Sequence, residues 1–110
     1  MAKSAKSVMY TRSELAIANV ALKIDYDSKG EAINRMLMVD QMKDGIAIND
    51  KLEASTENRK QADGTMADEL VDSEIEFTTT EKALLLSFMD RKWSVADAKS
   101  FLSLKEKLSA

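Results

Sequence analysis

The chain has 110 residues, close to the usual size of one domain, and we expect one domain with at most one appendage. Apolar residues make up 45% and charged residues 32%, which excludes a wholly disordered chain. The absence of cysteine and histidine excludes disulfides, thiolate metal sites, cysteine nucleophiles and imidazole acid–base chemistry. A formal net charge of −3 argues against a dedicated nucleic-acid binder, which usually carries a basic stripe.

The first segment, residues 1–12, carries Lys3, Lys6 and Arg12 and no acid. No apolar stretch follows this basic start, so the pattern is not that of a signal peptide, and we expect a flexible basic tail. No apolar run approaches the ~20 residues that a membrane span needs, so we expect no membrane partner. Together with the missing cysteine framework, this favours a cytoplasmic protein.

Residues 13–52 are predicted to form an N-terminal pair of helices. In residues 13–24, the alanines and Ser13 as N-cap favour a helix that is apolar almost all round and central to the core. The alternation from Val20 to Tyr26 is, however, also a strand signal. Helix is our prediction for this segment, with strand as the alternative.

The turn at residues 25–30 resembles the start of an EF-hand loop, in which acidic side chains alternate before a glycine. Lys29 and Met36 stand where that loop needs oxygen ligands, so we expect no calcium site. The glycines of the chain are isolated and form no phosphate-binding loop. We therefore expect no metal, no cofactor and no catalytic residue.

A long helix is predicted over residues 31–52, where large apolar residues keep a spacing of three to four. Gly45 lies inside it at a cost of about 1 kcal/mol relative to alanine, so the helix kinks or stops there. The excess of apolar residues over residues 33–48 is more than one core face needs, and it predicts a homo-oligomer, most simply a homodimer. Methionine-rich helix surfaces suit adaptable protein contacts. We therefore assign partner binding to Met36, Met38, Val39 and Met42.

Residues 53–73 are polar and small, and we expect an acidic mobile linker. Residues 50–76 hold nine acids against three bases. This stretch is interpreted as a solvated loop, as a docking segment for a basic partner surface, or as a mimic of DNA charge. For the docking interpretation we assign partner binding to Asp68, Glu69 and Asp72, which would cluster on one helical turn.

The remaining segment, residues 74–110, is predicted to form a C-terminal helical hairpin. Its first residues, 74–78, alternate as in one short strand. One strand needs a partner, which residues 7–10, residues 20–26 or another copy of the chain would supply.

Two capping patterns mark the helices of the hairpin. Thr78 and Glu81 fit a capping box, and Ser94 with Asp97 repeats the pattern with a shorter acid. Trp93, the single tryptophan, lies in the turn between the two helices. It either caps the core or is exposed as an anchor for a partner.

These elements predict a mainly α fold: a small domain of about four helices with a C-terminal helical hairpin. An α+β fold with one short β pair is the alternative. The uncertain segment at residues 15–26 decides between the two, because a strand there would supply the missing partner.

For function we expect a small non-enzymatic protein that binds a larger protein and regulates, inhibits or adapts it. Accessory proteins of prokaryotes and their phages are commonly of this type. One alternative is a nucleic-acid-associated regulator that uses the basic N-terminus and the C-terminal hairpin, where Lys99, Lys105 and Lys107 would contact phosphates. Another alternative is a structural subunit of a larger assembly.

Overall fold

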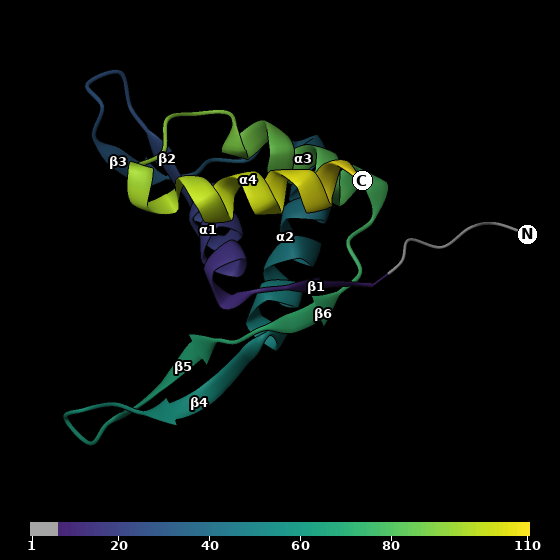
Figure 1. Ribbon diagram of the computed structural model, residues 1–110. Coiled ribbons are helices and arrows are strands. Elements are labelled where there is room, and N and C mark those ends of the chain that lie inside the picture. Colours follow the sequence, from purple (N-terminus) through teal and green to yellow (C-terminus); the bar gives the residue numbers. More distant parts are fainter. Residues whose placement is uncertain (1–6) are drawn as a thin grey trace, which may run out of the picture.

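The computed structural model describes residues 7–110, of which helices take 52% and strands 21%. These residues form a mixed α+β domain with four helices and three small antiparallel sheets, so the predicted mainly α class is wrong. The helices are α1 (Arg12–Lys23), α2 (Val39–Ala54), α3 (Thr79–Met89) and α4 (Val95–Ser109). The strands are β1 (Val8–Tyr10), β2 (Ile24–Tyr26), β3 (Ala32–Asn34), β4 (Thr56–Lys60), β5 (Met66–Leu70) and β6 (Ser73–Ile75). Figure 1 shows the helices gathered into one body, from which the β4–β5 pair projects.

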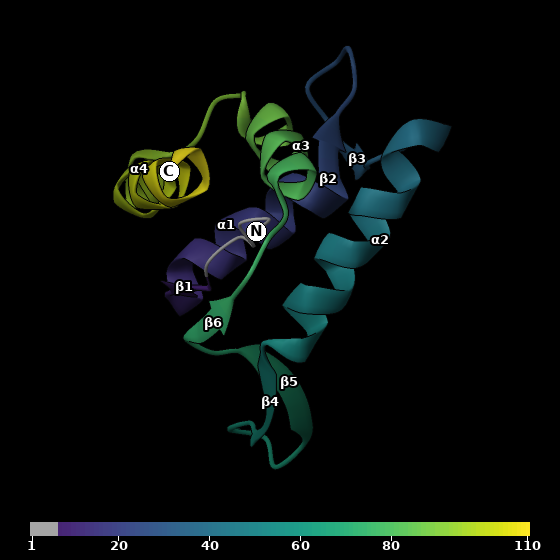
Figure 2. The same ribbon diagram turned by 90° about the vertical axis from the view of Figure 1, so that its right-hand side faces the viewer.

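Helix α1 is the centre of the core. Leu15, Ala18 and Ala21 are fully buried, and the two alanines let neighbouring helices approach closely. The helix contacts α2, α3 and α4, and Figure 2 shows it between α4 on one side and α2 on the other. The predicted helix and its central place are confirmed, but it is not covered all round, because Ser13, Ala16, Val20 and Lys23 form an exposed stripe. The alternating residues at its end continue into β2.

The predicted flexible tail, residues 1–12, is structured from Val8 onward. Strand β1 pairs antiparallel with β6, with Val8 opposite Ile75. Tyr10, at the end of β1, is fully buried, and its ring packs edge-on against Phe77 with the centroids 5.4 Å apart. The strand predicted near the start of the C-terminal segment is thus confirmed, and the N-terminal segment is its partner.

The N-cap of α1 is Thr11 rather than Ser13. Its Oγ1 accepts a hydrogen bond from the N–H of Glu14 at 3.2 Å, and Glu14 Oε1 accepts from the N–H of Thr11 at 2.8 Å. This reciprocal capping box satisfies two backbone donors, more than a single serine cap can. Lys3 and Lys6 of the expected basic tail lie outside the described residues.

The helix predicted over residues 31–52 begins only at Val39. The residues before it form β3, which pairs with β2 in an antiparallel hairpin. Asp27 closes the hairpin turn, because its Oδ1 accepts two backbone N–H groups at 2.9 Å each, and Gly30 adopts a φ of +82° that favours glycine. A turn with its own internal hydrogen bonds therefore removes these residues from the helix.

The mobile linker predicted at residues 53–73 contains the β4–β5 hairpin instead. Its turn is closed by Asp63, whose Oδ1 accepts from the N–H and the hydroxyl of Thr65 at 3.0 and 2.6 Å. Gly64 follows with a φ of +89°. Leu70 packs against the core and anchors the base of the hairpin, while the tip projects from the body (Figure 1). We call this hairpin, residues 56–70, the arm.

The C-terminal helices begin where their caps predict. Thr78 Oγ1 accepts from the N–H of Glu81 at 3.2 Å, and Glu81 Oε1 accepts from the N–H of Thr78 at 3.0 Å, so this capping box is confirmed. Ser94 is the N-cap of α4, although its hydroxyl bonds the Asp97 carboxylate at 3.0 Å rather than a backbone N–H. Residues 90–94 join the two helices. Helix α4 makes its broader contact with α1, which leaves the hairpin partly open.

Candidate functional site

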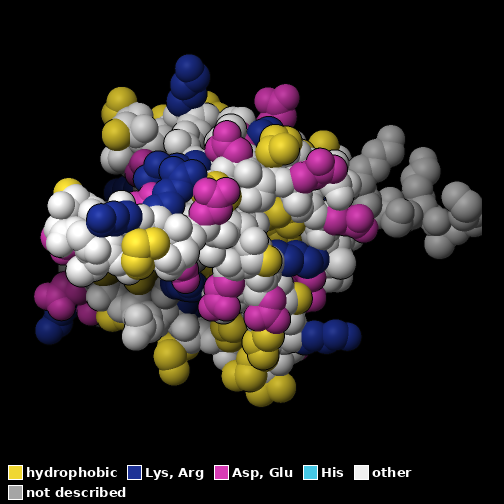
Figure 3. Space-filling view, turned by 90° about the horizontal axis from the view of Figure 1, so that it is seen from below, with side chains coloured by type: hydrophobic (Ala, Val, Ile, Leu, Met, Phe, Trp, Pro, Cys, Tyr) yellow, Lys and Arg dark blue, Asp and Glu magenta, His cyan; other side chains and the backbone are white. Residues whose placement is uncertain are grey.

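The side chains predicted to bind a partner in the second helix, Met36, Met38, Val39 and Met42, lie where the chain enters α2. They are 83%, 69%, 83% and 45% exposed. Ile46, one turn further along α2, is 61% exposed and extends the same surface. We call these five residues the methionine surface. Figure 3 shows hydrophobic side chains gathered at the lower edge of the view, which corresponds to the right-hand side of Figure 2, where α2 lies.

Helix α2 exposes these side chains because its opposite face already supplies the core. Gly45, Ile48 and Leu52 are buried on that face, with the usual helical spacing of three and four. Leu37 turns inward, and its Cδ1 lies 2.7 Å from the position that a Cβ on Gly45 would occupy. The bare backbone at Gly45 lets Leu37 pack on α2, while the methionine on either side of Leu37 is exposed.

A cleft of about 410 Å³ adjoins the methionine surface, between α2 and the segment that leads from β3. Its apolar walls include Leu22, Leu37 and Ile46, and its polar lining includes Asn34 and Asn49. Within residues 7–110 the buried Oδ1 of Asn49 has no hydrogen-bond partner. The cleft therefore offers an apolar wall with an amide beside it, which suits a side chain of a docked protein.

Trp93, predicted either to cap the core or to be an exposed anchor, is half-buried. Its Nε1 donates to the Met89 carbonyl at 2.9 Å, and its ring packs on Phe101 with the centroids 5.7 Å apart. The guanidinium of Arg91 lies 4.7 Å from the ring centroid. These contacts on three sides support the capping interpretation.

Two arginines occupy the C-terminal end of α1. Arg35 Nε donates to the Ala21 carbonyl at 2.9 Å, and Arg91 Nη1 donates to the Ile24 carbonyl at 2.5 Å. Cations at a helix C-terminus satisfy its free carbonyls and complement the helix dipole. Both guanidinium groups therefore fasten later segments to the end of α1.

The predicted acidic contact of Asp68, Glu69 and Asp72 does not form one cluster. Asp68 and Glu69 are neighbours on β5, so their side chains point to opposite faces of the arm. Each accepts a hydrogen bond from a nearby amide side chain, at 3.0 and 3.2 Å. Asp72 accepts from the N–H of Arg12 at 2.7 Å, at the N-terminus of α1, where a negative charge is favourable. The clustering expected from a helical turn is wrong, because the segment is a strand followed by a cap.

A buried carboxylate joins α4 to α1. Glu14 is 3% exposed at its side chain, its Oε1 lies 2.7 Å from Lys107 Nζ, and its Oε2 accepts from the Ser103 hydroxyl. Burial by itself raises the pKa of Glu14, but the hydrogen bonds from Lys107 and Ser103 outweigh it and lower that pKa. The Tyr10 hydroxyl is buried without a partner in the described residues, and burial, then the Glu14 charge, raise the pKa of Tyr10 to about 12. Both groups keep one charge state near neutral pH, which suits a structural role.

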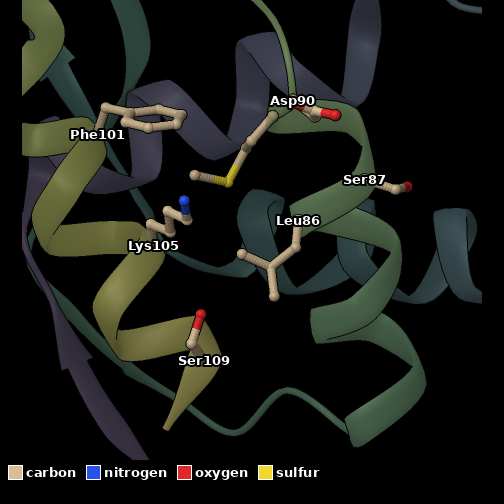
Figure 4. A pocket seen from close by; sticks show the side chains of 7 residues that line it. Leu86, Ser87, Asp90, Phe101, Lys105 and Ser109 are labelled. Atoms are coloured by element: carbon tan, nitrogen blue, oxygen red, sulfur yellow. The ribbon is translucent and has the colours of Figure 1, made fainter.

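A second cavity, of about 360 Å³, lies between α3 and α4. Leu86, Met89 and Phe101 give it an apolar lining. Figure 4 shows Lys105 directed into this space, whereas Ser87 and Asp90 point away from it. The Ser87 hydroxyl donates to the Leu84 carbonyl of its own helix at 2.7 Å.

No family model matches this chain, and neither a curated protein nor a solved structure is significantly similar to it. No helix within residues 7–110 is long and apolar enough to cross a membrane. In the same residues, His, Cys, Asp and Glu side chains nowhere gather in a group of three that could hold a metal ion. The surfaces of the molecule are therefore the evidence for its function.

Proposed function

We propose that this protein is a small non-enzymatic interaction protein, which binds a larger partner protein and regulates, inhibits or adapts it. The observation that carries the proposal is the methionine surface, whose five large apolar side chains are 45–83% exposed on one end of α2. Contiguous apolar patches of this kind on a small domain usually mark a protein contact. Three of the five side chains are methionines, which adapt their shape to a partner at little cost.

The arm provides a second contact surface. It is a two-stranded hairpin attached through its base, and such a hairpin is marginally stable alone in water. Its acids are Glu57, Asp63, Asp68 and Glu69, against the bases Arg59 and Lys60. A basic groove on a larger protein would complement this charge and would hold the hairpin in place.

The nucleic-acid alternative has less support. Of the lysines expected to contact phosphates, Lys107 is engaged by Glu14 at 2.7 Å and by the Met9 carbonyl at 2.8 Å. Lys99 and Lys105 remain exposed. A loss of binding with a steep salt dependence would support this alternative, and no binding at low salt would exclude it.

The proposed setting is the cytoplasm. The chain has no cysteine and needs no oxidising compartment to fold, and its core is built from helix packing around α1. The structural-subunit alternative would require large concentration-dependent assemblies, which light scattering of the purified chain would reveal.

The proposal is tested by affinity capture from an extract of the source cells, followed by size exclusion of the eluted complex. The baits are the wild type, Met42→Lys/Ile46→Lys in the methionine surface, and Asp68→Lys in the arm. Val95→Lys is the matched control, because Val95 is 93% exposed on α4, away from both surfaces. We expect the wild type to capture one partner in stoichiometric amount. Met42→Lys/Ile46→Lys captures at least about tenfold less of it, and the control captures as much as the wild type. Equal retention by all four baits would contradict the proposal.

A further inference from the structure

The methionine surface fits a second copy of this chain. The five side chains expose on the order of 500 Å², more than half of the ~800 Å² that each partner buries in a stable interface. A second copy brings the same patch, so the apolar area of one chain is matched by that of the other. We infer that two copies of this chain pair through the methionine surface in a two-fold symmetric dimer. The inference rests on the proposed function, because it names the occupant of the same docking surface.

Charge complementarity supports this occupant. Lys43 borders the apolar stripe on α2, and Asp40 lies on the same flank, further round the helix; both are exposed, and neither forms an ion pair within residues 7–110. In a two-fold symmetric dimer, the partner's α2 runs antiparallel to the first α2. For the two methionine surfaces to pack on each other, the axis passes beside Met42, near the middle of the surface. Lys43 of each chain then faces Asp40 of the other. Each chain thus offers one acid and one base, and the antiparallel arrangement places each of them opposite a residue of opposite charge on the other chain.

The rest of the molecule leaves this contact open. The methionine surface lies at the beginning of α2, whereas the arm starts at the other end of the same helix. Figure 2 shows α2 descending from its free beginning to the base of the arm. Ile46, the last residue of the surface, lies eight residues before the end of α2 at Ala54, which is about 12 Å along the helix. A dimer formed at one end of α2 therefore keeps both arms available for a larger partner.

The first test is the absolute mass of the purified full chain by light scattering after size exclusion, from about 1 µM to about 1 mM. We expect a discrete dimer at the upper concentrations. Met42→Lys places two like charges beside the axis, and we expect it to weaken the dimer at least about tenfold. Val95→Lys, the matched exposed control, keeps the wild-type mass. A wild type that is monomeric throughout the series overturns the inference.

The second test exchanges charges. Lys43→Glu and Asp40→Lys each place like charges across the axis, so each variant alone dimerises about tenfold more weakly than the wild type. In an equimolar mixture, the introduced glutamate of one variant faces the introduced lysine of the other, and the remaining Asp40 faces the remaining Lys43. We therefore expect the mixed dimer to dominate in native mass spectrometry. Mutation of a purely intramolecular contact cannot produce this recovery. A mixture that shows only the weak association of its two components overturns the inference.

The outcomes separate this inference from the proposed function. If the wild type is monomeric and Met42→Lys/Ile46→Lys still loses a captured protein, the surface docks a different protein and only the dimer is wrong. If the wild type is monomeric and the capture is unchanged by that variant, both are wrong. Circular dichroism of each variant must show wild-type helix content, since Asp40 also lies in the first turn of α2.

Discussion

In the C-terminal half of α2, Ile48 and Leu52 are buried in the core, whereas in the N-terminal half Met42 and Ile46 face solvent. The two halves share a helix and a similar content of apolar residues. The difference lies in what packs on them: α1 and α3 cover the core-facing side, and no described element covers the methionine surface. Apolar periodicity along a helix therefore identifies an apolar face without specifying what covers that face.

The lysines of α2 differ between the two halves in the same way as the apolar residues. Lys51 donates to the Glu81 carboxylate at 2.5 Å and to the Glu76 carbonyl at 2.9 Å, and the Glu81 side chain is only 5% exposed. Lys43, two turns earlier, is exposed and forms no ion pair within residues 7–110. The first lysine fastens α2 to α3, and the second is available to a partner.

The largest expected effect on the free energy of unfolding comes from shortening one apolar side chain in each half of α2 to alanine. Leu52→Ala removes a side chain that is 2% exposed, and the cavity lowers the free energy of unfolding by about 2–5 kcal/mol. Ile46→Ala, at a residue 61% exposed, lowers it by less than about 1 kcal/mol. Urea unfolding at a concentration where the chain is monomeric measures both. Equal losses would mean that Ile46 is packed within one chain, and the contrast between the halves would be lost.

A somewhat smaller effect is expected from the two lysines. Lys51→Met leaves the buried Glu81 carboxylate without its cation, and we expect a loss of about 1–3 kcal/mol of unfolding free energy. Lys43→Met changes it by less than about 0.5 kcal/mol. The same urea experiment applies, with Lys51→Arg as a variant that keeps the charge. A neutral Lys51→Met would show that Glu81 is stabilised by its capping box alone.

Much of the core could be predicted from the sequence because its signals are local. The Thr78–Glu81 capping box depends on residues three apart, and the apolar character of α1 is visible within one helix. The exposure of Met36 and Val39 was also predictable, because residues 33–48 contain more apolar side chains than one face of a helix can bury.

The remainder depends on contacts or on weaker signals. The strands of the arm are polar and lack alternation, so their only local sign is Asp63–Gly64, a pair typical of hairpin turns. Periodicity also left open which of the apolar residues 33–48 are covered, because spacing defines a face but not what packs on it. Asp68 and Glu69 were expected to share one helical turn, and the strand separates them because neighbours on a strand alternate between faces.

The pH dependence of stability sharpens the contrast between a buried carboxylate and a surface one. Burial raises the pKa of Glu14, but its hydrogen bonds, led by Lys107, lower it below the ordinary value of 4.5. A carboxyl group with a lowered folded-state pKa stabilises the protein above pH 4.5, and this stability is lost as the pH falls through the folded-state pKa. Thermal unfolding from neutral to acidic pH measures this loss. We expect Glu14→Gln to reduce the fall of the melting temperature at acidic pH, and the exposed control Asp50→Asn to keep the wild-type fall. The same fall in both variants would exclude Glu14 as the cause of the pH dependence.

The smallest effect concerns the junction of the two halves, where Leu37 packs over Gly45. Alanine in place of a helical glycine gains about 1 kcal/mol of stability, but its Cβ would lie 2.7 Å from Leu37 Cδ1. Gly45→Ala should therefore gain little in the wild type, because Leu37 must move, and about 1 kcal/mol in a Leu37→Ala background. The difference between the two backgrounds, measured by urea unfolding, is the coupling between the residues. Equal gains would mean that Leu37 does not rest on Gly45, and the outward placement of Met36 and Met38 would lose its physical cause.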